Sequence, residues 1–119
     1  MKLALLNESG IGAIDIKGTL DEYYDLIECD CIDIVTRKVG DTYFDIICDD
    51  EGLLKDNPRV SAVDMRCNPM LVGNLIFSHI DDNGETVGIK DDEIEFLKEH
   101  IGLAISEQGI FCNVIQMDY

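Results

Sequence analysis

Two stretches of the chain carry apolar residues at the spacing of an amphipathic helix. In the first, positions i, i+3, i+4 and i+7 share one side of a helix: Leu20, Tyr23, Tyr24 and Ile27. Thr19, followed three residues later by Glu22, forms the capping-box pattern that begins such a helix. The second helix is expected to begin at Asp91 or Asp92 and to end at Gly102, with a buried side made of Ile94, Leu97 and Ile101.

Alternating and apolar runs indicate β-strands on both sides of the first helix. Residues 2–6 and 13–17 flank the polar loop "NESGIG" and predict a hairpin. Residues 31–38 and 42–49 flank Gly40 and Asp41, a glycine-first pair that suits a two-residue type II′ turn.

The register of this second hairpin follows from its turn. It places Val35 opposite Ile46 on one face and Ile34 opposite Ile47 on the other. Because both faces carry apolar pairs, the second face needs cover from a helix, another segment or a second subunit.

The rest of the chain is expected to contain three further strands and a turn. Residues 58–69 are expected to form a loop with a short strand, and residues 70–80 one apolar strand in which Gly73 marks a bulge or a close approach. A turn follows at residues 82–84, and residues 109–119 add a last strand. We therefore predict one small α+β domain over residues 1–119, with a mostly antiparallel sheet and two principal helices.

Acidic residues outnumber basic ones, 25 Asp and Glu against 9 Lys and Arg, which gives a formal net charge of −16. Such a field repels nucleic acids and anionic membranes and attracts basic protein surfaces. We therefore expect a basic protein partner, no direct contact with nucleic acid and no membrane. Acidity that only keeps the protein in solution is the alternative.

The sequence also indicates a compartment. No apolar run approaches the roughly 18 residues of a membrane span, and "MKLALLNESG" is too short and too poor in basic residues for a secretory signal. The five cysteines are an odd number without a disulfide framework, which fits reduced thiols. We expect a cytoplasmic protein.

The acids gather on both helices and after one strand. Asp21 and Asp25 form a like-charge pair at i, i+4, as do Glu95 and Glu99, and such a pair costs a helix a few tenths of a kcal/mol. A row of carboxylates can imitate the closely spaced charges of a nucleic acid. The candidate partner-binding residues are Asp21, Glu22, Asp25, Glu28, Asp49, Asp50, Glu51, Asp91, Asp92, Glu95 and Glu99.

Motifs for catalysis or metal binding do not stand out. There is no glycine-rich phosphate loop, nucleophile-elbow serine or His-Glu zinc motif. The cysteines and the two histidines match no usual zinc spacing, and neither Gly52 nor Gly84 completes an EF-hand loop. We expect a non-enzymatic protein with no metal and no cofactor.

One further sequence pattern consists of a turn after a strand, an arginine and a glycine in a later strand. Asp50, Glu51 and Gly52 form a turn after a strand, with Gly52 expected at positive φ, and Arg59 and Gly73 follow. This pattern resembles an uncharacterised domain-of-unknown-function family of phages, plasmids and integrative elements. The resemblance covers roughly residues 2–100. It implies a fold and a mobile-element setting, and it implies no catalytic residues.

These features predict a non-enzymatic inhibitor, encoded by a mobile element, that blocks a basic nucleic-acid-binding host defence protein by mimicking nucleic acid. Its target would be a CRISPR effector or another defence nuclease, as for anti-CRISPR or anti-restriction proteins. The alternative is a protein that binds a small ligand, such as a nucleotide signal that it sequesters, at a subunit interface, for instance in a homodimer, with phosphate contacts from Arg37, Arg59 or Arg66. A hydrolase that uses Asp or His chemistry is the third hypothesis.

Overall fold

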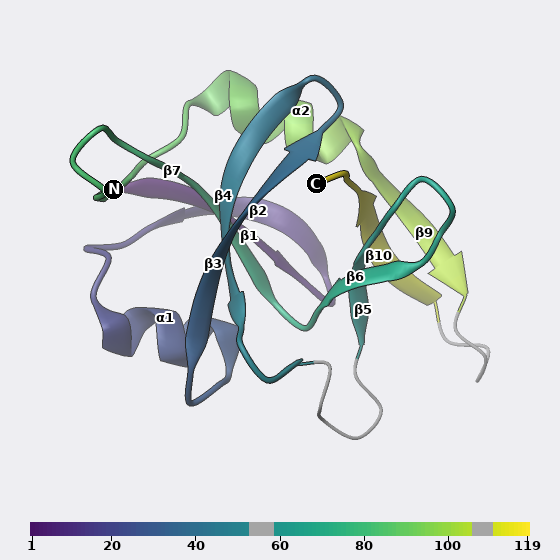
Figure 1. The fold of residues 1–119 in the computed structure, drawn as a ribbon, viewed down its shortest axis with the longest axis horizontal. Helices are drawn as coiled ribbons and strands as arrows, with labels where there is room; N and C mark the ends of the chain where they lie inside the picture. The colour runs from purple at the N-terminus through teal and green to yellow at the C-terminus, as the bar shows by residue number, and fades with distance from the viewer. Residues whose placement is uncertain (53–58, 106–110) are drawn as a thin grey trace.

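The computed structural model describes residues 1–52, 59–105 and 111–119, with the side chains of residues 103–105 and 111–112 left aside. Six strands form the larger sheet in the order β2-β1-β7-β4-β3, with β8 paired to β7, and all its pairs are antiparallel (Figure 1). Their bounds are Lys2–Asn7 (β1), Gly10–Asp15 (β2), Ile32–Val39 (β3), Thr42–Asp49 (β4), Leu75–Ile80 (β7) and Thr86–Val87 (β8).

Four strands form the smaller sheet, in the order β6-β5-β10-β9. Its strands are Val60–Val63 (β5), Pro69–Val72 (β6), Ile101–Ile105 (β9) and Phe111–Gln116 (β10). β5 and β10 pair in parallel and the other two pairs are antiparallel. A bridge between Lys38 and Asp118 joins the end of β3 to the residues that follow β10.

The larger sheet is covered on both faces. Successive residues of its strands point to opposite sides, so Leu3, Ile47 and Ile76 pack with Tyr23 and Ile27 of helix α1 (Leu20–Ile27). Their neighbours Ala4, Ile46 and Phe77 pack on the other side with helix α2 (Asp91–Glu99) and with the smaller sheet. Figure 1 shows α1 and α2 at opposite ends of the view. Neither described helix is long and apolar enough to span a membrane.

The local predictions are confirmed where a turn or a cap specifies the structure. Thr19 and Glu22 form the capping box of α1. Val35 pairs with Ile46 and Ile34 with Ile47, and Gly40 has the positive φ of +60° that the tight turn requires. On the face that needed cover, α1 buries Ile47, whereas Ile34 remains 39% exposed. The α+β class, with mostly antiparallel sheets and two helices, is confirmed as well.

Three predictions of element bounds are wrong. Residues 70–80 are not one strand: Gly73, at a φ of +74°, and Asn74 separate β6 from β7, which belong to different sheets. α2 ends at Glu99 rather than Gly102, since Ile101 already begins β9. The first hairpin has a two-residue turn at Glu8 and Ser9, and its glycines lie inside β2.

The expected positive φ at Gly52 is also wrong. β4 ends at Asp49 and a turn follows, as expected, yet Gly52 does not have a positive φ. A Cβ at this position would come within 2.5 Å of the Val72 side chain, so Gly52 permits a close approach between segments. The short strand expected within the loop at residues 58–69 is confirmed as β5. Pro58 lies outside the described residues, as do residues 109 and 110 of the expected last strand.

Candidate functional site

Helix α1 presents two kinds of acid. Asp21 and Asp25 are exposed, and α1 contains no lysine or arginine. Glu22 serves the helix itself, because its Oε1 accepts hydrogen bonds from the backbone N–H of Thr19 at 2.9 Å and of Gly18 at 3.0 Å. The hydrogen bond from the Thr19 N–H is the main reason that the pKa of Glu22 lies below its ordinary value. Asp21 and Asp25 are therefore the acids of α1 that face solvent.

The acids of α2 lie on the other face of the larger sheet. Asp91, Asp92, Glu95 and Glu99 are all exposed. Asp91 forms an ion pair with Lys2, and Glu95 contacts Lys98 at 3.3 Å. The two acidic helices thus belong to separate surfaces, and that of α2 is partly neutralised.

The acids at the end of β4 form a third group. Asp50 and Glu51 are exposed, and Asp49 accepts a hydrogen bond from the Glu51 N–H at 2.9 Å. The Asp50 N–H donates to the Cys31 carbonyl at 3.0 Å, which ties this turn to the start of β3. Nearby, burial raises the pKa of the Cys48 thiol to about 12, with the charge of Asp33 acting in the same direction. That thiol is unreactive at neutral pH.

The three arginines of the alternative site are not brought together. Arg59 immediately precedes β5 and Arg66 follows it, so the strand separates them by roughly 13 Å or more at about 3.3 Å per residue. Arg37, on β3, lies 4.7 Å from the ring centroid of Tyr119 and donates to the Thr36 carbonyl at 2.9 Å.

An open groove of about 410 Å³ lies between α1 and the β1–β2 turn. Three of its lining residues are acids: Glu8 of the turn, Asp25 of α1 and Glu28 at the C-terminal cap of α1. The remaining lining is amide, hydroxyl and apolar: Leu5, Asn7, Ser9, Leu26 and Asn74. We call these eight residues the acidic groove. Of its three acids, Asp25 and Glu28 are among the residues predicted from the sequence, and Glu8 is not.

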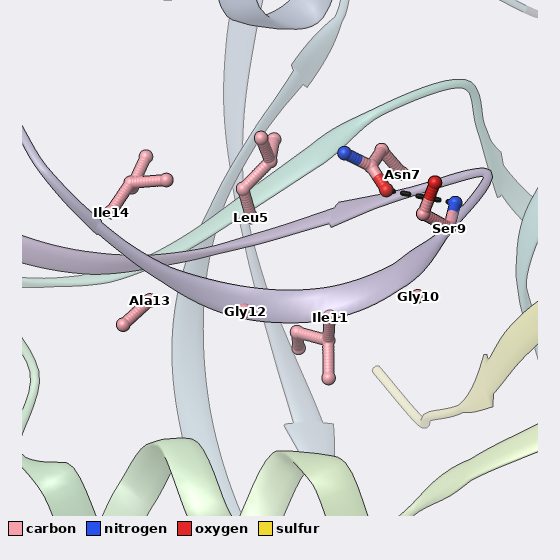
Figure 2. A pocket seen from close by; sticks show the side chains of 8 residues that line it. All are labelled: Leu5, Asn7, Ser9, Gly10, Ile11, Gly12, Ala13 and Ile14. Carbon is pink, nitrogen blue, oxygen red and sulfur yellow. Dashed lines mark hydrogen bonds between the residues drawn. The ribbon is translucent and has the colours of Figure 1, made fainter.

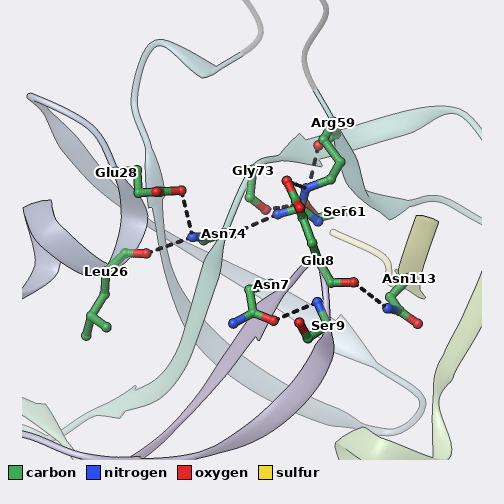
Figure 3. A network of polar contacts seen from close by, with 10 residues as sticks. All are labelled: Asn7, Glu8, Ser9, Leu26, Glu28, Arg59, Ser61, Gly73, Asn74 and Asn113. Carbon is green, nitrogen blue, oxygen red and sulfur yellow. Dashed lines mark hydrogen bonds and ion pairs between the residues drawn. The ribbon is translucent and has the colours of Figure 1, made fainter. Parts of the chain in front are cut away.

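A polar network holds one wall of the acidic groove (Figure 3). The Asn74 side chain accepts from Arg59 Nη2 at 2.8 Å and donates to the Leu26 carbonyl at 2.8 Å and to Glu28 at 3.3 Å. Arg59 Nε lies 3.9 Å from the Glu8 carboxylate. Asn74 thereby fixes the end of α1 to the junction of the two sheets. The sequence offered no signal for this network, because its members are far apart in the chain.

The acidic groove continues into a hollow of about 290 Å³ beside β2, with which it shares Leu5, Asn7 and Ser9. Figure 2 shows the side chains of Leu5 and Ile14 on one side of the hairpin and those of Ile11 and Ala13 on the other. Gly10 and Gly12, which also line the hollow, have no side chain to fill it. Apolar walls and an acidic extension suit a basic side chain with an aliphatic stem.

No cluster of three or more metal-binding side chains is found within the part of the chain that the structure describes. The described histidines have other contacts. His79 lies 2.5 Å from Glu93, whose carboxylate also accepts from the Lys90 N–H, and His100 contacts the Phe96 carbonyl at 2.8 Å. Although burial opposes ionisation of Glu93, its hydrogen bonds with His79 and with the Lys90 N–H outweigh burial and hold the pKa of Glu93 below its ordinary value. The contact between His79 and Glu93 fixes the start of α2 to β7.

The model of one protein family, a domain of unknown function (DUF3846), matches residues 1–102. The chain belongs to this family. Every residue of the acidic groove and of the hollow falls within the DUF3846 domain, whereas β10 lies beyond the matched residues. Comparisons with curated proteins and with solved structures give no match.

Proposed function

We propose that this DUF3846 protein is a non-enzymatic inhibitor, encoded by a mobile element, whose α1 surface binds a basic nucleic-acid-binding protein of a host defence system. One observation carries the proposal: the exposed acids of α1, Asp21 and Asp25, have no ion-pair partner among the described residues and lead into the acidic groove. The resemblance to a family of phages, plasmids and integrative elements supports the setting.

Asp21 lies in the first turn of α1, where the helix dipole favours negative charge, but its pairing with Asp25 and the position of Asp25 do not benefit the fold. Asp21 and Asp25 repel each other at i, i+4. Asp25 and Glu28 lie toward the C-terminal end of α1, where the helix dipole disfavours negative charge. An arrangement that costs the isolated domain free energy is explained if a basic partner neutralises it.

The α1 surface can also occupy a site made for nucleic acid. The carboxylates of Asp21 and Asp25 are about 6 Å apart along the helix axis, at about 1.5 Å of rise per residue. Glu28 extends the negative surface beyond the helix, and Glu8 adds to it, although Arg59 Nε lies 3.9 Å from the Glu8 carboxylate and neutralises it in part. A cleft lined with lysine and arginine to hold phosphates would attract such a row of charges, and bound inhibitor would exclude the nucleic acid.

A pair of charge-matched variants tests the proposal. Purified defence nucleases are assayed for DNA cleavage with the wild-type protein, with Asp21→Lys/Asp25→Lys, and with Glu95→Lys/Glu99→Lys. We expect one nuclease to be inhibited by wild type and by the α2 variant, and the α1 variant to need at least about tenfold more protein, or roughly 1.4 kcal/mol. Inhibition should also weaken as salt rises, because the interaction is between exposed charges.

The α2 variant makes the experiment decisive, because it changes net charge by the same amount. Equal inhibition by all three proteins would contradict the assignment to α1. An equal loss of inhibition by the α1 and α2 variants would mean that inhibition depends only on the total charge of the protein. Circular dichroism of each variant separates lost binding from lost folding.

One observation favours a second candidate, the binding of a phosphate-bearing ligand. Nη1 of Arg59 is buried and has no hydrogen-bond partner among the described residues. A buried guanidinium N–H of this kind suits a phosphate oxygen. Calorimetric titration with cyclic dinucleotides and with inorganic phosphate tests this candidate: saturable binding that Arg59→Lys abolishes would support it, and heats of dilution alone would reject it.

A further inference from the structure

Strand β2 is an open edge of the larger sheet. It pairs only with β1, among the residues that the structure describes. Met1 and Ile16 exchange backbone hydrogen bonds at 3.0 and 2.9 Å. Because hydrogen-bonded pairs alternate along an antiparallel ladder, Ile14, Gly12 and Gly10 also bond to β1. The N–H and C=O groups of Ile11 and Ala13 therefore point outward from the sheet.

This edge lacks the features that normally prevent strand pairing. Natural edge strands carry lysine, proline, inward charges or a bulge. Residues 10–14 read "GIGAI", with no charge and no proline, and their register with β1 is continuous; the one charge of the strand, Asp15 at its end, pairs with the Met1 ammonium at 2.9 Å. The opposite edge strand, β3, contains Arg37 and Lys38, and Asp118 bridges to its end.

The backbone of the domain does not require a glycine at position 12. Gly12 does not adopt a positive φ, it forms no bulge, and a Cβ placed on it would meet nothing within 4 Å. Glycine inside a strand weakens the strand and often marks a place where another backbone or a ligand comes close. Neither a positive φ nor a bulge accounts for Gly12, and the open space at its Cβ position leaves room for a side chain from another chain.

The hollow beside Gly12 indicates what that chain carries. A residue paired across the open edge of β2 from Gly12 would occupy a non-hydrogen-bonded position, where side chains approach most closely. Its side chain would lie across the glycine, between Leu5 and Ile14. Asn7 and Ser9 then lead to the acids of the acidic groove, Glu8, Asp25 and Glu28.

We propose that β2 is the docking edge for an extended, arginine-bearing segment of the basic partner, which adds to the larger sheet as a strand. The stem of one arginine lies over Gly12, and its guanidinium reaches toward Asp25. Backbone hydrogen bonds to Ile11 and Ala13 hold the segment, and the groove selects its charge. This inference rests on the proposed function and specifies how the partner is recognised.

The test uses a synthetic probe, acetyl-Arg-Val-Arg-Val-Arg-amide, and two valine variants. Gly12→Val fills the hollow, and since valine favours strands we expect the variant to fold with unchanged or higher stability. Gly102→Val is the matched control. Gly102 lies in the other sheet's edge strand β9, has no positive φ, and a Cβ placed on it would also meet nothing within 4 Å.

Calorimetry should show at least about tenfold weaker probe binding by Gly12→Val and no change for Gly102→Val. A probe with N-methyl groups on alternate residues should also bind weakly, because it cannot complete the ladder. Hydrogen exchange at the Ile11 and Ala13 amides should slow when the unmodified probe is bound.

The outcomes separate this inference from the proposed function. If Gly12→Val and the N-methylated probe bind as well as their parents while Asp21→Lys/Asp25→Lys loses binding, strand addition is wrong and the acidic surface stands. If the charge variant also binds normally, both proposals fail. If wild type is a dimer by light scattering and Gly12→Val is a monomer, the edge pairs with a second copy, which overturns a basic segment as its occupant.

Discussion

Replacing Asn74 with alanine tests whether the polar network holds the acidic groove in place. The substitution removes one acceptor from Arg59 and one donor shared by the Leu26 carbonyl and Glu28. Leu26 lies in the last turn of α1, where carbonyls lack partners within the helix. Asn74 therefore completes the hydrogen bonding of a helix end from a distant part of the chain.

The expected cost follows from the surroundings of each bond. The bonds to Arg59 and to the Leu26 carbonyl are partly buried, and the longer bond to Glu28 is exposed. Leaving a buried polar group without a partner costs about 1–3 kcal/mol, so we expect a loss of about 2–4 kcal/mol in the free energy of unfolding. For a domain of 119 residues this lowers Tm by roughly 8–16 °C.

Urea unfolding followed by circular dichroism measures this loss directly. Asn113→Ala is the control, because its side chain donates a single exposed hydrogen bond, to the Glu8 carbonyl at 3.0 Å. We expect the control to lose less than about 1 kcal/mol. Equal midpoints for the two variants, at equal m-values, would refute the conclusion that Asn74 joins α1 to the two sheets.

Two further predictions concern titratable groups. The pKa of Glu22 in the folded state lies below its ordinary value of 4.5, so its ionised form stabilises the fold at neutral pH and this contribution disappears as the pH falls through the folded-state pKa. Glu22→Gln should be less stable than wild type at neutral pH, and the urea midpoints should converge in acid; a constant difference at every pH would contradict this. Iodoacetamide at neutral pH should label the exposed Cys31 and Cys67 and spare Cys48 until urea unfolds the protein. Mass spectrometry that finds Cys48 labelled as quickly in the folded state would refute its burial.

Features set by neighbouring residues could be predicted from the sequence. The Thr19 cap and the Gly40 turn depend on a few adjacent residues, and the turn also fixes the pairing of Val35 with Ile46. The break at Gly73 was missed because residues 70–80 are almost continuously apolar. Two buried strands from different sheets give the same pattern as one long strand.

The candidate site was predicted only in part for a similar reason. Charge composition pointed to Asp25 and Glu28, since both lie on one recognisable helix. The contribution of Asn74 depends on a contact across 48 residues of sequence, which no local pattern reveals. The sequence predicts a loop at Gly12 because glycine usually breaks a strand, and only the register with β1 shows that Gly12 lies inside β2.

The division into two sheets has a consequence for the order of folding during synthesis. All strands of the larger sheet lie before residue 88, and α1 is also complete by then. The smaller sheet cannot be completed until β10 is made, because β5 and β6 pair with each other but β10 lies between β5 and β9. A ribosome-bound chain can therefore assemble the larger sheet, with α1 and the open edge of β2 already formed, while the core on its other face still waits for α2 and the last strand.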